Sequence, residues 1–159
     1  MTTRVRLHTM ARPILAWVAL MVPATAATQT TCDGGGNYRI RLTPSAIDYG
    51  VVSSADLDAG QIVMGSMRIR IRPRGGANGS WNLCLQADSG QFGPGGKPVG
   101  DVEWQLAGSP GWQPALTGGQ LVVQGNGNQT VDVLFRILLD WNELPGIYVA
   151  PVTFLVARQ

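Results

Sequence analysis

Hydrophobic and polar residues alternate with a period of two along most of this chain. The longest alternation places apolar side chains at every second position from Val131 to Leu139. Successive side chains of a strand point to opposite faces, whereas an amphipathic helix repeats about every 3.6 residues. No window shows a helical stripe of comparable length. The pattern therefore predicts strands in the runs 38–42, 47–52, 67–71, 81–86, 102–106, 121–123, 131–139 and 147–157.

Glycine, proline and asparagine separate these runs, as at Pro73 and in the segment 125–128. About seven to nine short strands with such turns predict an all-β fold, an immunoglobulin-like antiparallel β-sandwich. We expect Trp81 to pack between the two sheets and the glycine-rich segment 88–100 to form one long loop. The last run is apolar on both faces, and Pro151 within it predicts a strand whose edge is not fully paired.

The first 26 residues have the pattern of a secretory signal peptide. Arg4, Arg6 and Arg12 precede the apolar run 14–22, and Ala24-Thr25-Ala26 supplies the small residues that signal peptidase requires. This apolar run is shorter than the roughly 20 residues that span a bilayer. We expect residues 27–159 to form a single secreted domain in the periplasm or on the cell surface, with no transmembrane segment after processing.

Processing would remove the only histidine, His8, and with it several classes of chemistry. Serine–histidine and cysteine–histidine nucleophiles, histidine acid–base catalysis and the commonest zinc sites all need that residue. Nine basic and all ten acidic residues follow residue 26, so the processed chain carries a net charge of −1. We therefore expect no catalytic residues, no metal site, no cofactor and no nucleic-acid partner.

Both cysteines, Cys32 and Cys84, follow the predicted signal peptide. Two cysteines in an oxidising compartment usually pair. A bridge closing a loop of about 50 residues would contribute ~4 kcal/mol in the chain-entropy model. The alternative is a pair of free or metal-binding thiols, but two thiols without histidine make a poor metal site.

Three features together resemble bacterial pilin-like and spore-coat-U-like secreted domains. An early cysteine precedes the element Pro44-Ser45-Ala46-Ile47-Asp48-Tyr49-Gly50, and a second cysteine lies in a mid-chain strand. The segment from Pro145-Gly146 to Phe154 is similar to the closing strand of fimbrial subunits. The resemblance implies surface or pilus subunits and a periplasmic chaperone as partners. It also implies an assembly strand whose alternate residues fill the core, here Tyr148, Ala150, Val152, Phe154 and Val156.

Chaperone–usher subunits polymerise when an N-terminal strand with alternating apolar residues enters the groove of a neighbour. In this chain the start of the predicted domain, Ala27 to Thr31, is polar. The nearest alternating set is Tyr38, Ile40 and Leu42, which could donate a strand or form the domain's own first strand. A tip subunit, an accessory subunit and a self-complete surface domain fit as well.

The best polar candidates for binding are four arginines at alternate positions, Arg68, Arg70, Arg72 and Arg74. On one strand they would share a face at a spacing of about 7 Å. They could bind acidic glycans, lipopolysaccharide phosphates or DNA, or form a solvated face that protects a sheet edge. Trp112, in a turn-rich segment, could stack on a sugar, whereas we favour core positions for Trp104 and Trp141.

Two acidic motifs resemble functional sites only in part. Asp101 and Glu103 on one strand face beside Trp104 resemble a glycosidase pair, but such carboxylates must flank a sugar from opposite sides. We favour solvent-facing acids there. The segment Asp56-Leu57-Asp58-Ala59-Gly60 resembles the start of a calcium loop but lacks the later ligands, so we expect a turn.

The sequence thus favours an exported, non-catalytic structural or assembly protein of the cell surface, a pilus or fimbria-like component. The alternative is a secreted carbohydrate- or polyanion-binding module that uses Trp112 and the arginines.

Overall fold

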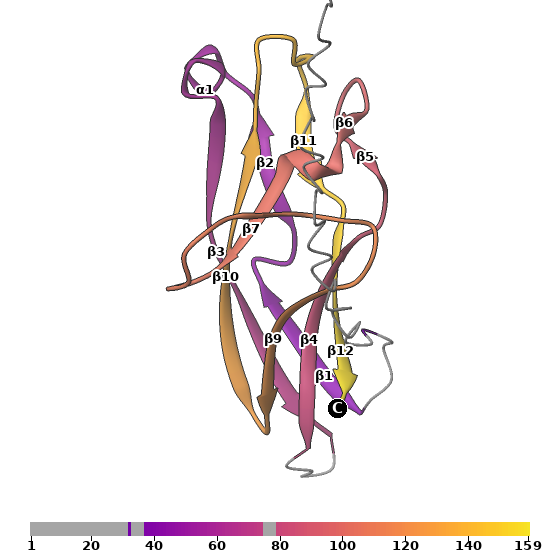
Figure 1. Ribbon diagram of the computed structural model, residues 1–159. Helices are drawn as coiled ribbons and strands as arrows, with labels where there is room; N and C mark the ends of the chain where they lie inside the picture. The colour runs from indigo at the N-terminus through magenta and orange to yellow at the C-terminus, as the bar shows by residue number, and fades with distance from the viewer. Residues whose placement is uncertain (1–31, 33–36, 75–78) are drawn as a thin grey trace, which may run out of the picture.

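The computed structural model describes residues 32, 37–74 and 79–159, so the predicted signal peptide lies outside the described residues. Nearly all regular secondary structure of the described chain is antiparallel β-strand (Figure 1). Within it, no helix is long and apolar enough to cross a membrane. The elements are β1 (Tyr38–Thr43), β2 (Ile47–Val51), α1 (Ser54–Ala59), β3 (Gln61–Pro73), β4 (Ser80–Ala87), β5 (Gln91–Phe92), β6 (Lys97–Pro98), the 3₁₀ helix η1 (Val99–Asp101), β7 (Val102–Leu106), β8 (Gln113–Pro114), β9 (Gln120–Asn126), β10 (Gln129–Leu138), β11 (Ile147–Ala150) and β12 (Val152–Arg158).

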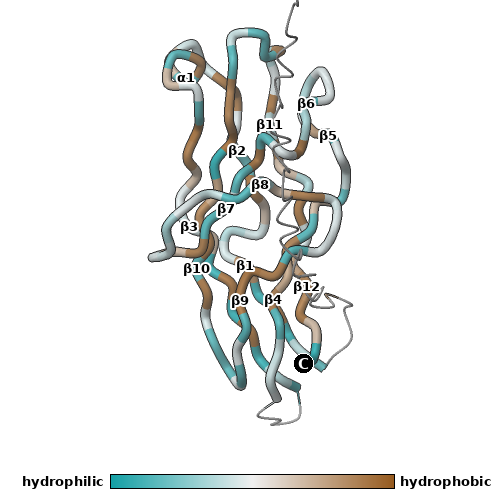
Figure 2. The backbone as a smooth tube through the Cα atoms, in the orientation of Figure 1, coloured by the Kyte–Doolittle hydropathy of each residue, from teal (hydrophilic) through white to brown (hydrophobic). Residues whose placement is uncertain are grey.

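Two main sheets face each other and confirm the predicted β-sandwich. One has the order β1-β3-β10-β7-β8 and the other β12-β4-β9, while β2 pairs with β11 and β5 with β6. Hydrophobic and hydrophilic residues alternate along the strands in Figure 2, and the inward apolar set forms one core. Phe135 of β10 meets Phe154 of β12 edge to face, with ring centroids 6.2 Å apart, and so joins the two layers.

The alternation of inward-facing and outward-facing side chains along β3 shifts by one residue at one point. Val133 of β10 lies opposite Met67 of β3, and Phe135 lies opposite Met64. Two residues of β10 thus correspond to three residues of β3. The extra residue of this β-bulge falls at Gly65–Ser66. Because of it, the apolar residues on both sides of the bulge reach the core, although they differ in sequence parity.

Strand β4 is buried on both faces. Trp81 faces the core, and its indole Nε1 donates a hydrogen bond to the Gly127 carbonyl oxygen at 3.0 Å. The facing residue is Gly125, where a Cβ would lie 2.5 Å from the Trp81 ring. On the outer face, fully buried Cys84 is bonded to Cys32 with a Cα–Cα distance of 5.8 Å, which confirms the predicted disulfide.

The described residues form twelve strands, more than the expected seven to nine. Three of the twelve, β5, β6 and β8, have only two residues, and the β5–β6 pair lies in 88–100, where we expected one long loop. The final run is not one strand but two, β11 and β12, divided at Pro151. Proline has no N–H to continue a ladder, and its carbonyl oxygen accepts a hydrogen bond from Asp88 at 2.7 Å as the chain passes from β2 to β4.

We expect the double substitution Cys32→Ala, Cys84→Ala to lower the free energy of unfolding by about 4 kcal/mol, because the bridge restricts the unfolded chain over its 52-residue separation. Urea unfolding followed by tryptophan fluorescence measures the loss. Reduction of the unsubstituted protein with dithiothreitol should give the same decrease. An unchanged midpoint after complete reduction would contradict the assigned role.

Candidate interaction surfaces

The assembly strand predicted from the sequence contributes to two sheets. Tyr148 and Ala150 belong to β11, and Val152, Phe154 and Val156 belong to β12. All are buried except Val152, which is half-buried. Their side chains thus contribute to this domain's own core, so a partner that pairs with β12 would contact them chiefly through the backbone edge.

An open seam separates the edges of the two main sheets. β1 ends the five-stranded sheet and β12 ends the three-stranded sheet, and among the described residues no strand pairs with either along this boundary, the β1–β12 seam. A cavity of about 150 Å³ lies at its end, between Leu42 of β1, the connection 45–47, and Val152 and Phe154 of β12. Beyond this cavity β2 and β11 pair directly and close the boundary (Figure 1).

Among the described residues, the backbone of β12 has polar groups without a strand partner on its seam side. At the two ends of its ladder with β4, Asp88 N–H donates to Pro151 and Gln159 N–H donates to Ser80. Hydrogen-bonded and non-bonded pairs alternate in an antiparallel ladder. Counted from both ends, Val152, Phe154 and Val156 occupy non-bonded positions opposite β4. Their N–H and C=O groups therefore point away from β4, toward the seam.

The pair β2–β11 presents apolar side chains outward. Val51, Ile147 and Val149 are 67%, 61% and 42% exposed, and Ile147 lies opposite Val51. Clustered exposed apolar residues of this kind mark interaction surfaces.

The outer face of β3 carries Arg68, Arg70 and Arg72, whereas Arg74 lies beyond the end of the strand at Pro73. The expectation of four arginines on one strand face is therefore wrong by one residue. β3 is an inner strand between β1 and β10, so these arginines do not protect a sheet edge. The neighbouring strand β1 places Arg39 opposite Arg72 and Arg41 opposite Arg70. These five exposed arginines are called the arginine face below: Arg39, Arg41, Arg68, Arg70 and Arg72.

Arg39 and Arg41 were not predicted as binding residues, although the sequence carries a signal for them. They occupy the polar positions of the alternating run 38–42, and pairing this run with the arginine-bearing run 67–71 would have placed them side by side.

Trp112 does not join the arginine face. Its ring lies under the guanidinium of Arg136, 4.6 Å from the Arg136 Cζ, and it is half-buried. Arg136 also pairs with Glu103. One face of the predicted sugar-stacking ring is thus covered by a cation–π contact. Trp104 is buried as expected, but Trp141, expected in the core, is 66% exposed.

The two acidic motifs have structural roles. Asp101 belongs to η1 rather than a strand and pairs with Lys97 at 2.8 Å, so the expected strand-face pair with Glu103 does not form. Asp56 lies in α1, not in a plain turn, and accepts hydrogen bonds from the hydroxyl and N–H of Ser53 in a capping box. These bonds lower the pKa of Asp56. In the part of the chain that the structure describes, no group of acidic, histidine or cysteine side chains could hold a metal ion.

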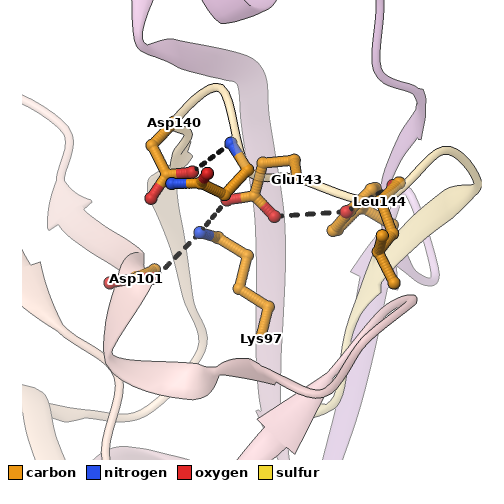
Figure 3. A network of polar contacts seen from close by, with 7 residues as sticks. Lys97, Asp101, Asp140, Glu143 and Leu144 are labelled. Atoms are coloured by element: carbon orange, nitrogen blue, oxygen red, sulfur yellow. Dashed lines mark hydrogen bonds and ion pairs between the residues drawn. The ribbon is translucent and has the colours of Figure 1, made fainter.

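Lys97, the one lysine of the chain, lies in a buried polar network (Figure 3). Its ammonium group pairs with Asp101 and with Glu143, and the Lys97 and Glu143 side chains are only 7% and 9% exposed. The Tyr148 hydroxyl lies 3.2 Å from Glu143 and donates to the Leu144 carbonyl oxygen at 2.8 Å. The network therefore ties the β5–β6 hairpin to the segment that leads into β11.

The network changes the pKa values of its members. Burial lowers the pKa of Lys97, but hydrogen bonds and charge attraction from Asp101 and Glu143 outweigh burial and leave this pKa above its usual value. Burial and the charge of Glu143 raise the pKa of Tyr148.

No protein-family model matches the chain, and no curated protein matches it. Among solved structures, the chain is similar to one from a chaperone–usher pilus, with 14% sequence identity and a TM-score of 0.43 over 98% of this chain and 100% of the other.

We expect Lys97→Met to lower the free energy of unfolding by about 3–5 kcal/mol, because it leaves buried Glu143 without its partner. Urea unfolding measures the change. Arg68→Met, which breaks the exposed pair with Asp132, is the matched control and should leave the urea midpoint nearly unchanged, because solvent screens that pair. Equal losses in the two variants would contradict a special role for the buried network.

We also expect stability to fall above about pH 10. Lys97 and Tyr148 have raised pKa values in the folded protein, so their stabilising effect is complete below the unfolded pKa values of about 10.4 and 10. It is lost as the pH rises through the folded values. Urea midpoints between pH 7 and about pH 11 test this. Tyr148→Phe should flatten the decrease, and a constant midpoint would refute the expectation.

Proposed function

We propose that this chain is an exported, non-catalytic structural component of the cell surface that assembles through the edge of β12. The observation that carries the proposal is the β1–β12 seam, where two sheet edges lie unpaired among the described residues. The disulfide Cys32–Cys84 supports an oxidising location, the periplasm or the cell exterior.

An added β-strand fits the chemistry of this seam. Strand addition requires free backbone groups on the receiving edge and pockets for alternate side chains. The N–H and C=O groups of Val152, Phe154 and Val156 supply the first requirement. The cavity beside Leu42 supplies a pocket for one apolar side chain at the end of the seam.

The incoming strand would come from another protein or from residues outside the described ones. Tyr38, Ile40 and Leu42, the set that could have been a donor, form β1 and pair with β3. The exposed apolar residues of β2–β11 lie beyond the cavity and would extend the contact with a neighbouring subunit. A periplasmic chaperone would protect the same edge before assembly.

The first test is size-exclusion chromatography with light scattering on the full chain, exported and purified from a periplasm. Aggregates or polymers that disappear when a pilus chaperone is co-expressed would support strand addition. A stable monomer that ignores the chaperone would rule out assembly through the β12 edge.

Val152→Pro tests the edge directly. It should remove one N–H that points into the seam while leaving the ladder with β4 intact, so association should weaken severalfold with a small change in stability. Val152→Ala, which shortens the side chain but keeps the N–H, is the control and should associate nearly normally. If both variants associate alike, the backbone edge is not the contact.

A further inference from the structure

We propose that the arginine face binds an acidic polysaccharide, a sulfated or uronic-acid glycan chain. This surface is separate from the seam and does not depend on assembly. Its five guanidinium groups come from two paired strands, with Arg39 opposite Arg72 and Arg41 opposite Arg70.

The arrangement is unfavourable for the isolated protein. Like charges directly opposite each other on paired strands destabilise a sheet. Among the described residues, the arginine face has one acidic partner: Asp132 pairs with Arg68 at 3.0 Å, and that arginine side chain remains 66% exposed. The remaining four guanidinium groups have no ion pair within the described chain, so a bound anion would relieve their repulsion.

Basic charge is concentrated on this face. Of the nine basic residues after residue 26, five form it, while Lys97 and Arg136 are neutralised by acids elsewhere in the domain. Because the processed chain would carry a net charge of −1, attraction of a polyanion would be local to this surface.

The arginine face contains two adjacent hollows, which could hold successive anionic groups of one glycan chain. One hollow of about 200 Å³ is lined by Arg41, Thr43, Arg68, Arg70 and Thr130. A second, of about 300 Å³, is lined by Arg39, Ile40, Arg41, Arg70 and Arg72. Arg41 and Arg70 line both, and alternate residues of one strand repeat at about 7 Å. Guanidinium groups bind sulfate and carboxylate oxygens in pairs, and the two threonine hydroxyls can bond sugar hydroxyls.

A glycan fits better than a single-stranded nucleic acid. Proteins that bind single strands add aromatic rings on which the bases stack. Neither hollow is lined by an aromatic side chain, and Trp112 is engaged with Arg136. The surface therefore offers charge and hydroxyl groups without a stacking platform.

The test measures binding of the full chain, purified from a periplasm, to heparin, polygalacturonate, neutral dextran and oligo(dT) by calorimetry. We expect the acidic glycans to bind and dextran not to bind. Arg70→Gln should weaken binding about tenfold, because Arg70 lines both hollows. Arg158→Gln removes the same charge from an exposed site on β12 and should leave the affinity nearly unchanged.

Asp132→Asn should act in the opposite direction and tighten binding, because it frees Arg68. Arg70→Gln should also raise the unfolding temperature slightly by relieving the repulsion with Arg41. Equal losses in Arg70→Gln and Arg158→Gln would show attraction by net charge only and overturn the proposal. Tighter binding of oligo(dT) than of either acidic glycan would also overturn it, in favour of a nucleic-acid surface.

Discussion

The change of partner strand at Pro151 is the constraint on which the arrangement of the sheets depends. A single closing strand would run along one partner, but this chain leaves β2 for β4 at Pro151. The Pro151 carbonyl oxygen accepts a hydrogen bond from Asp88 at the start of the new ladder, while its nitrogen has no hydrogen to return. Near Pro151, the chain also passes from β1 in the five-stranded sheet to β2, the partner of β11. Residues 45–47, where this passage occurs, line the same cavity as Pro151. One half of the sandwich boundary is therefore closed by β2–β11, and the other half is left as the β1–β12 seam.

The segments on both sides of this joint are held by interactions far apart in sequence. Before the joint, buried Glu143 bonds Lys97 and lies beside the Tyr148 hydroxyl, which positions the start of β11. After the joint, β12 pairs with β4, whose outer face is covered at Cys84 by the disulfide. Since β12 is supported from the β4 side, the core does not depend on a strand at its opposite edge, where none of the described strands pairs.

Local patterning predicted most of the fold, and long-range pairing explains what it missed. The alternation of β10 and the turn that precedes it were predicted, and this turn carries the chain from β9 in one sheet to β10 in the other. The burial of Trp81 and the disulfide were also predicted. The β-bulge of β3 was not, because the parity change between Met64 and Met67 has meaning only against the partner strand. Lys97 gave no signal, since its partner Glu143 lies 46 residues away. The arginine face was half-predicted, because its second row becomes visible only from the β1–β3 register.

Strand β1 connects the two proposed surfaces. Its inward side brings Leu42 to the cavity of the seam, and its outward side brings Arg39 and Arg41 to the arginine face. A strand added at the β12 edge would lie near β1 but would leave those arginines pointing outward. Each subunit of such an assembly would then present the same five guanidinium groups, repeated along the polymer. Repetition raises the effective concentration of a surface for a polymeric ligand, so weak binding by one domain could become strong adhesion by many.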